Sequence, residues 1–137
     1  MENIKLDTAG LLVIKDNQLL LAYSNNKKAW YLPGGKVNVG ETTQEALCRE
    51  IEEELNLKLN TDNLKYYCHI SAPAYGEKKN VIMEQDCFLY DLTETIHPSN
   101  EIGEIKYFSL KSYQKEEKQV IGVIAVFEQL AKDGLLY

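Results

Sequence analysis

The chain has 137 residues, of which 45% are hydrophobic and 26% charged, and its formal net charge is −6. This length and composition are typical of one folded globular domain, which we expect to span residues 1–137. The negative charge argues against a protein that binds nucleic acid or a membrane surface non-specifically, because such proteins present a basic face. Three cysteines without a C-x-x-C pair argue against a disulfide or zinc framework.

The chain begins MENIKLDTAG, which has neither the basic start nor the long apolar run of an export signal. No stretch approaches the roughly 20 apolar residues that a membrane-spanning helix requires. We therefore expect a cytoplasmic protein without a membrane partner.

The first part of the chain predicts short apolar strands. Residues 10–24 have the pattern of two strands joined by a hairpin turn at Asp16 and Asn17. Residues 29–35, AWYLPGG, predict a third strand, which Pro33 and the following glycines end.

The clearest helix signal covers residues 42–55. Thr42 followed three residues later by Glu45 has the spacing of a capping box, in which each side chain satisfies a backbone N–H at the start of the helix. Asn56 is expected to end this helix. A rotation of about 100° per residue places the apolar residues on one stripe, which must face the sheet. The stripe consists of Leu47, Cys48, Ile51 and Leu55.

Longer strands rich in β-branched and aromatic residues are expected at 64–71 and 81–92, followed by a short strand at 105–110. Residues 116–134 carry apolar residues at helical spacing and end at Gly134, so they predict a second helix. Strands mixed with two helices in one domain predict an α/β fold, namely an α/β/α sandwich with a mixed sheet between the helices.

The first helix also concentrates negative charge. Glu50, Glu53 and Glu54 lie at i, i+3 and i+4, so their carboxylates converge beside the apolar stripe. A helix rich in Glu is by itself most often a solvated face. Several oxygen ligands without His or Cys among them are, however, the donor set that suits Mg²⁺, with Mn²⁺ as the alternative.

The glycine-rich segment before the helix would complete such a site. Gly34, Gly35 and Gly40 allow the backbone to approach a ligand closely. We expect Gly34, Gly35 and Lys36 to belong to a loop that holds the phosphates of a substrate. A cation bound to both phosphates and carboxylates would join this loop to the helix, so the pattern predicts metal-bridged phosphate chemistry.

The joint spacing of these residues resembles the signature of the Nudix hydrolases, over residues 35–57. The matching positions are Gly35, Glu41, Arg49, Glu50, Ile51, Glu53, Glu54 and Leu57. The preceding WYLPGG and the order of strands and helices are also similar to the family. One position differs, because Asn56 stands where the signature has Gly. Asn is the commonest other residue in the left-handed conformation that ends a helix.

The resemblance implies a small single-domain Nudix hydrolase of the MutT-like kind. It implies that Glu50, Glu53 and Glu54 hold Mg²⁺, and that Glu50 or Glu53 is the general base for an attacking water. Glu41 and Arg49 would form an ion pair that supports the site.

Acidic residues outside the helix offer further candidates. Members of the family often recruit another metal-binding carboxylate from a later loop, where Glu101 is the first candidate and Glu104 the second. The alternative for both is a solvated loop acid. Glu84 and Asp86 share one face of a predicted strand, so one of them is a candidate for reading a base edge.

Aromatic residues suggest where a base would bind. Trp30 and Tyr31 alternate on a strand, so we expect one, preferably Trp30, in the core and the other near a base. The loop 72–80 offers Tyr75, Lys78 and Lys79 as a nucleotide-facing edge, with an ordinary hairpin loop as the alternative.

The implied activity is hydrolysis of a nucleoside diphosphate linked to another moiety. We expect a nucleoside triphosphate, ordinary or oxidised, to be cleaved to monophosphate and pyrophosphate; the alternative substrates are ADP-ribose, another nucleotide sugar or a dinucleoside polyphosphate. A non-catalytic nucleotide-sensing domain is less favoured, because all the carboxylates are present. A domain whose acidic helix binds a basic partner leaves the spacing unexplained. We expect the binding partner to be a small nucleotide and not a nucleic acid. A homodimer is compatible with the sequence.

Overall fold

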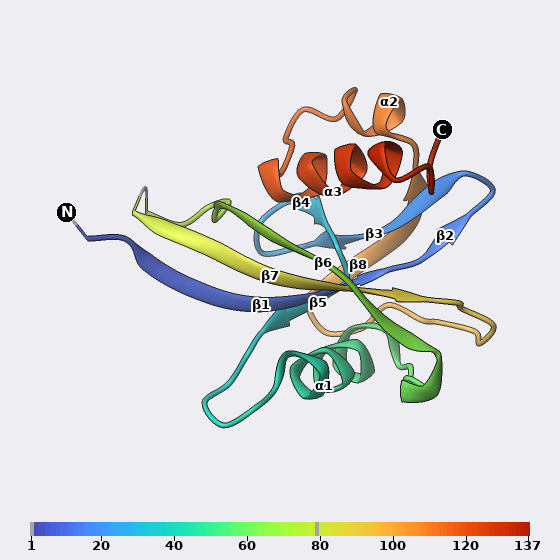
Figure 1. Ribbon diagram of the computed structural model, residues 1–137, viewed down its shortest axis with the longest axis horizontal. Helices are drawn as coiled ribbons and strands as arrows, with labels where there is room; N and C mark the ends of the chain where they lie inside the picture. The colour runs from blue at the N-terminus through green and yellow to red at the C-terminus, as the bar shows by residue number, and fades with distance from the viewer. Residues whose placement is uncertain (1, 79) are drawn as a thin grey trace.

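The computed structural model describes residues 2–78 and 80–137, in which a β-sheet lies between helix α1 (Thr43–Leu55) and helix α3 (Ile121–Lys132). Figure 1 shows α1 below this sheet and α3 above it, with the short helix α2 (Leu110–Tyr113) near α3. This arrangement confirms the predicted α/β fold. None of the helices in the described part of the chain combines the length and the apolar composition that crossing a bilayer requires.

The sheet between the helices, sheet A, is mixed as predicted. Its strands lie in the order β5 (Gly34–Lys36), β1 (Ile4–Leu12), β7 (Val81–Tyr90) and β6 (Leu64–Pro73). β1 and β7 run parallel, whereas the two outer pairs are antiparallel. β1 begins six residues earlier than the sequence pattern indicated. Its first residues are largely exposed, and their pairing with β7 holds them in the sheet.

A second sheet, sheet B, is antiparallel and was not predicted as a separate unit. Its central strand β3 (Gln18–Ser24) pairs with β2 (Ile14–Lys15), β4 (Ala29–Tyr31) and β8 (Ile102–Phe108). The predicted hairpin turn between β2 and β3 is confirmed, since both of its residues have positive φ, 50° and 61°. A one-turn 3₁₀ helix at Thr61–Asn63 precedes β6.

Each face of sheet A carries a hydrophobic core. Leu47, Ile51 and Leu55 of α1 are fully buried against β1 and β7, which confirms the predicted stripe, and Cys48 is half-buried beside them. Burial of each such side chain contributes roughly 1.5–3 kcal/mol. On the opposite face, Phe127 of α3 belongs to the second core. Packing on the two faces therefore fixes α1 and α3 against the sheet.

The predicted boundaries of β8 and α3 are wrong. β8 begins at Ile102 rather than at residue 105, because its first residues also pair with β3. β8 ends at Phe108 rather than at residue 110, because Ser109 caps the start of α2. α3 begins at Ile121 rather than at residue 116. The side chain of Gln119 donates to two carbonyl oxygens in the segment before it, so that this segment folds back on itself instead of joining the helix.

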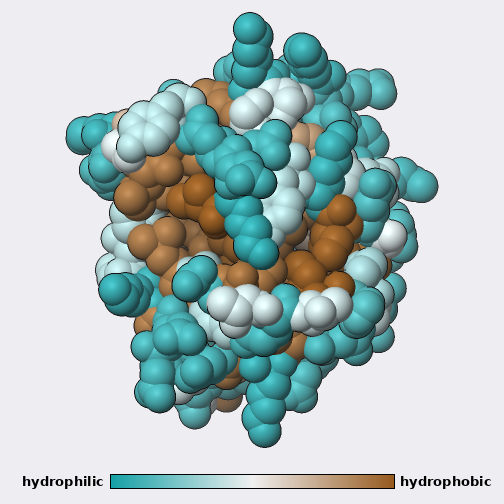
Figure 2. All heavy atoms as spheres, turned by 90° about the vertical axis from the view of Figure 1, so that its right-hand side faces the viewer, coloured by the Kyte–Doolittle hydropathy of each residue, from teal (hydrophilic) through white to brown (hydrophobic). Residues whose placement is uncertain are grey.

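Figure 2 shows the face of the molecule on which the β2–β3 hairpin and the C-terminus lie. Hydrophobic atoms gather in a hollow near the centre of this face, and hydrophilic atoms surround them. Part of the apolar interior is thus open to solvent on this side of the molecule.

Candidate active site

Helix α1 begins and ends where its sequence predicts. Thr42 Oγ1 accepts a hydrogen bond from the Glu45 N–H (3.1 Å), and Glu45 Oε1 accepts one from the Thr42 N–H (2.9 Å), which confirms the capping box. Asn56 adopts a left-handed conformation with φ 54° and ends the helix, and its side chain donates to the His97 carbonyl oxygen at 2.8 Å. Both ends of the acidic helix are therefore fixed by local contacts.

The loop before β8 binds the C-terminal end of α1. Ser99 Oγ and Asn100 Nδ2 donate to the carbonyl oxygen of Glu53 at 2.5 and 2.7 Å. The Ser99 N–H donates to the carbonyl oxygen of Glu54 at 2.9 Å. These bonds satisfy carbonyl groups that a helix end leaves without partners. They also place the next loop residue, Glu101, on the same cavity as Glu54.

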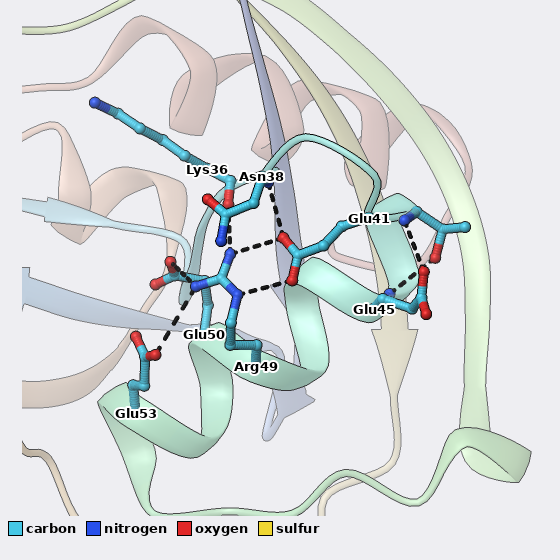
Figure 3. A network of polar contacts seen from close by, with 8 residues as sticks. Lys36, Asn38, Glu41, Glu45, Arg49, Glu50 and Glu53 are labelled. Carbon is cyan, nitrogen blue, oxygen red and sulfur yellow. Dashed lines mark hydrogen bonds and ion pairs between the residues drawn. The ribbon is translucent and has the colours of Figure 1, made fainter.

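Arg49 connects the segment before the helix to the helix itself (Figure 3). Its Nε and Nη2 atoms donate to the two carboxylate oxygens of Glu41 at 2.8 and 3.0 Å, and Nη2 also donates to the Lys36 carbonyl oxygen at 2.9 Å. Nη1 donates to Glu50 Oε1 at 2.8 Å. The bonds from Arg49, followed by one from the Asn38 N–H, lower the pKa of Glu41 to about 2. The expected Glu41–Arg49 pair is present, and it holds Glu50 as well.

Glu54 is the most buried of the carboxylates, with 6% of its surface exposed. Its Oε1 accepts a hydrogen bond from the Gly34 N–H at 3.0 Å. Its pKa is raised to about 8, mainly by burial and also by the negative charges of Glu50, Glu101 and Glu53, against the lowering effect of the Gly34 N–H. A buried carboxylate that faces three others is a place where a cation would be stabilised.

The residues expected in a phosphate-holding loop, Gly34, Gly35 and Lys36, form strand β5 instead, because they pair with β1. The glycines are needed there. Gly34 has φ +139°, and a Cβ atom at this position would lie 2.0 Å from the carbonyl oxygen of Ala9. A Cβ atom at Gly35 would lie 2.5–2.6 Å from the carboxylate of Glu50. The missing side chain of Gly35 therefore makes room for Glu50 against the sheet.

The donor set suits a hard divalent cation. Glu50, Glu54 and Glu101 line one cavity, whereas Glu53 is about half exposed and has its carboxylate 3.9 Å from Arg49 Nη1. Within residues 2–78 and 80–137, no three His, Cys, Asp or Glu side chains are already arranged to hold a metal ion. Mg²⁺ usually takes only one or two protein carboxylates and completes its shell with water and substrate phosphates. The carboxylates on the cavity fit that kind of site.

The cavity has a volume of about 540 Å³, within the range of small-molecule sites. Its lining is of two kinds. The polar part comes from α1, β5 and the neighbouring loops and consists of Asn26, Lys27, Gly34, Gly35, Lys36, Glu50, Glu54 and Glu101. The other part is largely apolar and aromatic and includes Leu6, Tyr31, Leu32, Tyr75, Met83 and Val120. Such a cavity suits a ligand that is charged in one part and flat and apolar in another.

The aromatic candidates divide as expected. Trp30 is 7% exposed and lies in the core, whereas Tyr31 lines the cavity. Tyr75 also lines the cavity and packs edge-on against Tyr31, with ring centroids 6.0 Å apart. Lys78 is exposed and is not a lining residue. Lys79 lies outside the described residues.

The remaining acidic candidates lie elsewhere. Glu104 does not line the cavity, so of the two loop acids only Glu101 does. Glu84 and Asp86 each bond to a ring nitrogen of His69 at 2.8 Å rather than facing the cavity. The residue between them, Gln85, lines the cavity and was missed. The alternation of side chains along a strand could have indicated it, because Gln85 must face the opposite side of the sheet from Glu84 and Asp86.

Residues 5–128 match the NUDIX domain. The chain belongs to the NUDIX family. NUDIX hydrolases act on phosphoanhydride bonds and generally use divalent metals. The matched region contains the whole of the site described above.

Two curated NUDIX relatives match short segments of the chain. One is an ADP-ribose pyrophosphatase of Methanocaldococcus jannaschii, 47% identical over 49 residues, which cover 34% of this chain and 29% of that protein. The other is a MutT-like protein of Streptomyces ambofaciens, 32% identical over 59 residues, which cover 43% of this chain and 38% of that protein. The alignments thus span well under half of either relative.

The fold agrees over a greater length. The crystal structure of a MutT protein from Methanosarcina mazei superposes with a TM-score of 0.76 at 20% identity and covers 98% of both chains. A likeness at this identity establishes the NUDIX fold alone.

Proposed function

We propose that this protein is a Mg²⁺-dependent pyrophosphohydrolase that cleaves a nucleoside triphosphate to a monophosphate and pyrophosphate. One observation carries the proposal: a single cavity of about 540 Å³ is lined by Glu50 and Glu54 of the acidic helix together with two packed tyrosines. Carboxylates with a bound cation suit phosphates, and aromatic rings suit a base.

The carboxylates have distinct roles in this proposal. Glu50, Glu53, Glu54 and Glu101 would hold the cation, which when bound lowers the pKa of water and offsets the charge of the phosphates. Glu50 or Glu53 takes the proton from the attacking water as general base. Mn²⁺ is the alternative cation, since it uses the same oxygen ligands.

Other side chains position this machinery. Arg49 bonds to Glu50 and to Glu41, so it keeps one carboxylate oriented while the cation and substrate come and go. Lys27 and Lys36 line the cavity beside the carboxylates and would contact the phosphates that the cation leaves uncovered.

These two lysines favour a triphosphate, because three linked phosphates carry more charge than the two of a nucleotide sugar. ADP-ribose is the second candidate, since a matching relative is named an ADP-ribose pyrophosphatase. Relatives named RNA pyrophosphohydrolase also match, one from Stutzerimonas stutzeri at 42% identity over 50 residues. A net charge of −6 disfavours a nucleic-acid substrate, so we propose a small nucleotide.

The test is a hydrolysis screen with Mg²⁺, with Mn²⁺ and with EDTA. It covers ordinary and oxidised nucleoside triphosphates, ADP-ribose, nucleotide sugars, dinucleoside polyphosphates and a 5′-triphosphorylated RNA. Glu53→Gln serves as the inactive variant, and Glu52→Gln, an exposed position on the same helix, is the matched control for loss of a charge.

Turnover of triphosphates that needs the cation, is lost in Glu53→Gln and persists in Glu52→Gln is the expected result. Turnover of ADP-ribose alone would replace the substrate assignment. No turnover of any compound, with nucleotides still bound, would indicate a nucleotide-sensing domain instead. Light scattering of the same sample tests for a homodimer.

A further inference from the structure

Strand β7 presents two different faces to its surroundings. Glu84 and Asp86 lie on one face, where both bond to His69 of the neighbouring strand. Gln85 and Cys87 lie on the other face, toward α3. Gln85 is the residue of this strand that brings a hydrogen-bonding side chain to the cavity.

The amide of Gln85 is fixed by packing, but its hydrogen-bonding capacity is only partly satisfied. The residue is 8% exposed. A Cβ atom at Gly10 would lie 3.1 Å from both Cδ and Nε2 of Gln85, so the amide packs directly on the backbone of β1. The thiol of Cys87 donates to Gln85 Oε1 at 3.8 Å. Among the described residues, Nε2 donates to no protein acceptor, which leaves its N–H groups for a ligand.

The surroundings make such a donor selective. Leu6, Leu32, Met83 and Val120 line the same cavity as the amide. An N–H group in an apolar, poorly solvated place binds an acceptor strongly and is costly to leave unpaired. Tyr31 lines the same cavity, and its hydroxyl is buried without a hydrogen-bond partner in the described part of the chain. A free amide donor beside the paired rings of Tyr31 and Tyr75 on one cavity points to a polar, flat ligand.

We propose that Gln85 is the residue that determines which nucleobase the enzyme accepts. This inference rests on the proposed function, because it places the base of the substrate in the apolar part of the cavity. Gln85 Nε2 donates to the ring carbonyl oxygen at position 6 of guanine or position 4 of uracil and thymine. A Gln amide whose oxygen and N–H groups are both free would pair with adenine through N6 and N7. Here the Cys87 thiol bonds to Oε1, so only the N–H groups are free, and the amino group that adenine and cytosine carry at these positions offers them no acceptor.

The first experiment measures kcat and KM for GTP and ATP with Mg²⁺, in the wild type and in Gln85→Met. Met has a similar length and no amide. Glu84→Gln is the matched control, because it changes the neighbouring residue on the opposite face of the strand. Binding of GMP and AMP, measured by calorimetry with and without Mg²⁺, gives a second readout that needs no hydrolysis.

The wild type is expected to prefer GTP in kcat/KM, and GMP in affinity, by roughly 5- to 150-fold. In Gln85→Met this ratio falls toward one, mainly through KM for GTP, while Glu84→Gln keeps it. Gln85→Glu, which retains the shape of the side chain and replaces the N–H donor by an acceptor, is expected to favour ATP. This second variant keeps the test decisive if Gln85→Met does not fold.

The two proposals fail in different ways. Hydrolysis of triphosphates with a GTP to ATP ratio that Gln85→Met leaves unchanged overturns the role of Gln85 and not the hydrolase. A wild type that prefers ATP overturns the role as well. Preference for GMP that depends on Gln85, without hydrolysis of any triphosphate, overturns the hydrolase and supports the role of Gln85.

Discussion

Replacing Glu54 by Gln should stabilise the cation-free protein at neutral and alkaline pH. In the fold, the pKa of Glu54 is about 8, against an ordinary value of 4.5, mainly because the carboxyl is buried. Each pKa unit corresponds to about 1.4 kcal/mol. At pH 7 the unfolded carboxyl is fully ionised and the folded one mostly protonated, so the cost amounts to about 3 kcal/mol. Gln keeps an oxygen that accepts from the Gly34 N–H and carries no charge.

The sign follows from the raised pKa. Between pH 4.5 and about 8 the folded state binds more protons than the unfolded state, so the free energy of unfolding falls as the pH rises. The stabilisation from Glu54 is fully present below pH 4.5 and is lost above pH 8. Urea denaturation in EDTA at pH 5 and pH 8 measures this. Glu54→Gln should match the wild type at pH 5 and exceed it by about 3–5 kcal/mol at pH 8.

The second part of the test measures how Mg²⁺ changes the free energy of unfolding. Mg²⁺ binds the folded state and needs an ionised carboxylate, so it should raise the stability of the wild type more at pH 8 than at pH 6. Glu54→Gln should lose most of that gain, and Glu52→Gln should keep it. Titrating groups that do not interact with Glu54 cancel in the difference between wild type and variant, whereas the coupling of Glu54 to Glu50, Glu53 and Glu101 is part of the measured difference. A difference that stays constant from pH 5 to pH 8 would refute the electrostatic account of Glu54.

Three further substitutions test the framework of the site. Arg49→Lys cannot make the paired bonds to Glu41, so kcat should fall roughly 10- to 100-fold; an unchanged kcat in steady-state assays would remove its positioning role. Gly35→Ala places a methyl group 2.5–2.6 Å from the carboxylate of Glu50 and should lower kcat about 100-fold, with circular dichroism used to check that the fold is retained. Asn56→Ala puts a Cβ residue without a stabilising side chain at φ 54° and should cost about 1–2 kcal/mol in thermal denaturation; an unchanged melting temperature would contradict the strain.

The sequence predicted best what short-range rules govern. The start of α1 at Thr42, its end at Asn56 and its buried stripe follow from capping, left-handed propensity and a period of 3.6 residues. Each of these depends on residues within two helical turns of one another. The convergence of Glu50 and Glu54 was predictable for the same reason, because helical geometry alone makes residues four apart neighbours on the helix surface.

Contacts between distant segments were less predictable. The segment at Gly34 and Gly35 was expected to be a loop, because glycines allow the backbone to approach a ligand closely. It forms β5 because it pairs with β1. Glycine is required there, since a side chain at Gly34 would clash with the backbone of β1 and one at Gly35 would clash with Glu50. The choice of Glu101 over Glu104 depends on the loop that binds the end of α1, and no local pattern encodes that contact.

The error at strand β7 shows why a charge is a poor guide to a binding face. Glu84 and Asp86 were predicted as candidates for reading a base edge, but His69 on the adjacent strand pairs with both, and these bonds raise the pKa of its imidazole. A polar residue whose partners lie on its own sheet is already satisfied and has little to offer a ligand. Gln85 is uncharged, buried and short of partners. In a cavity with apolar walls, leaving this amide unpaired costs free energy. A base that bonds to the amide avoids that cost, so the amide rather than the nearby carboxylates distinguishes one base from another.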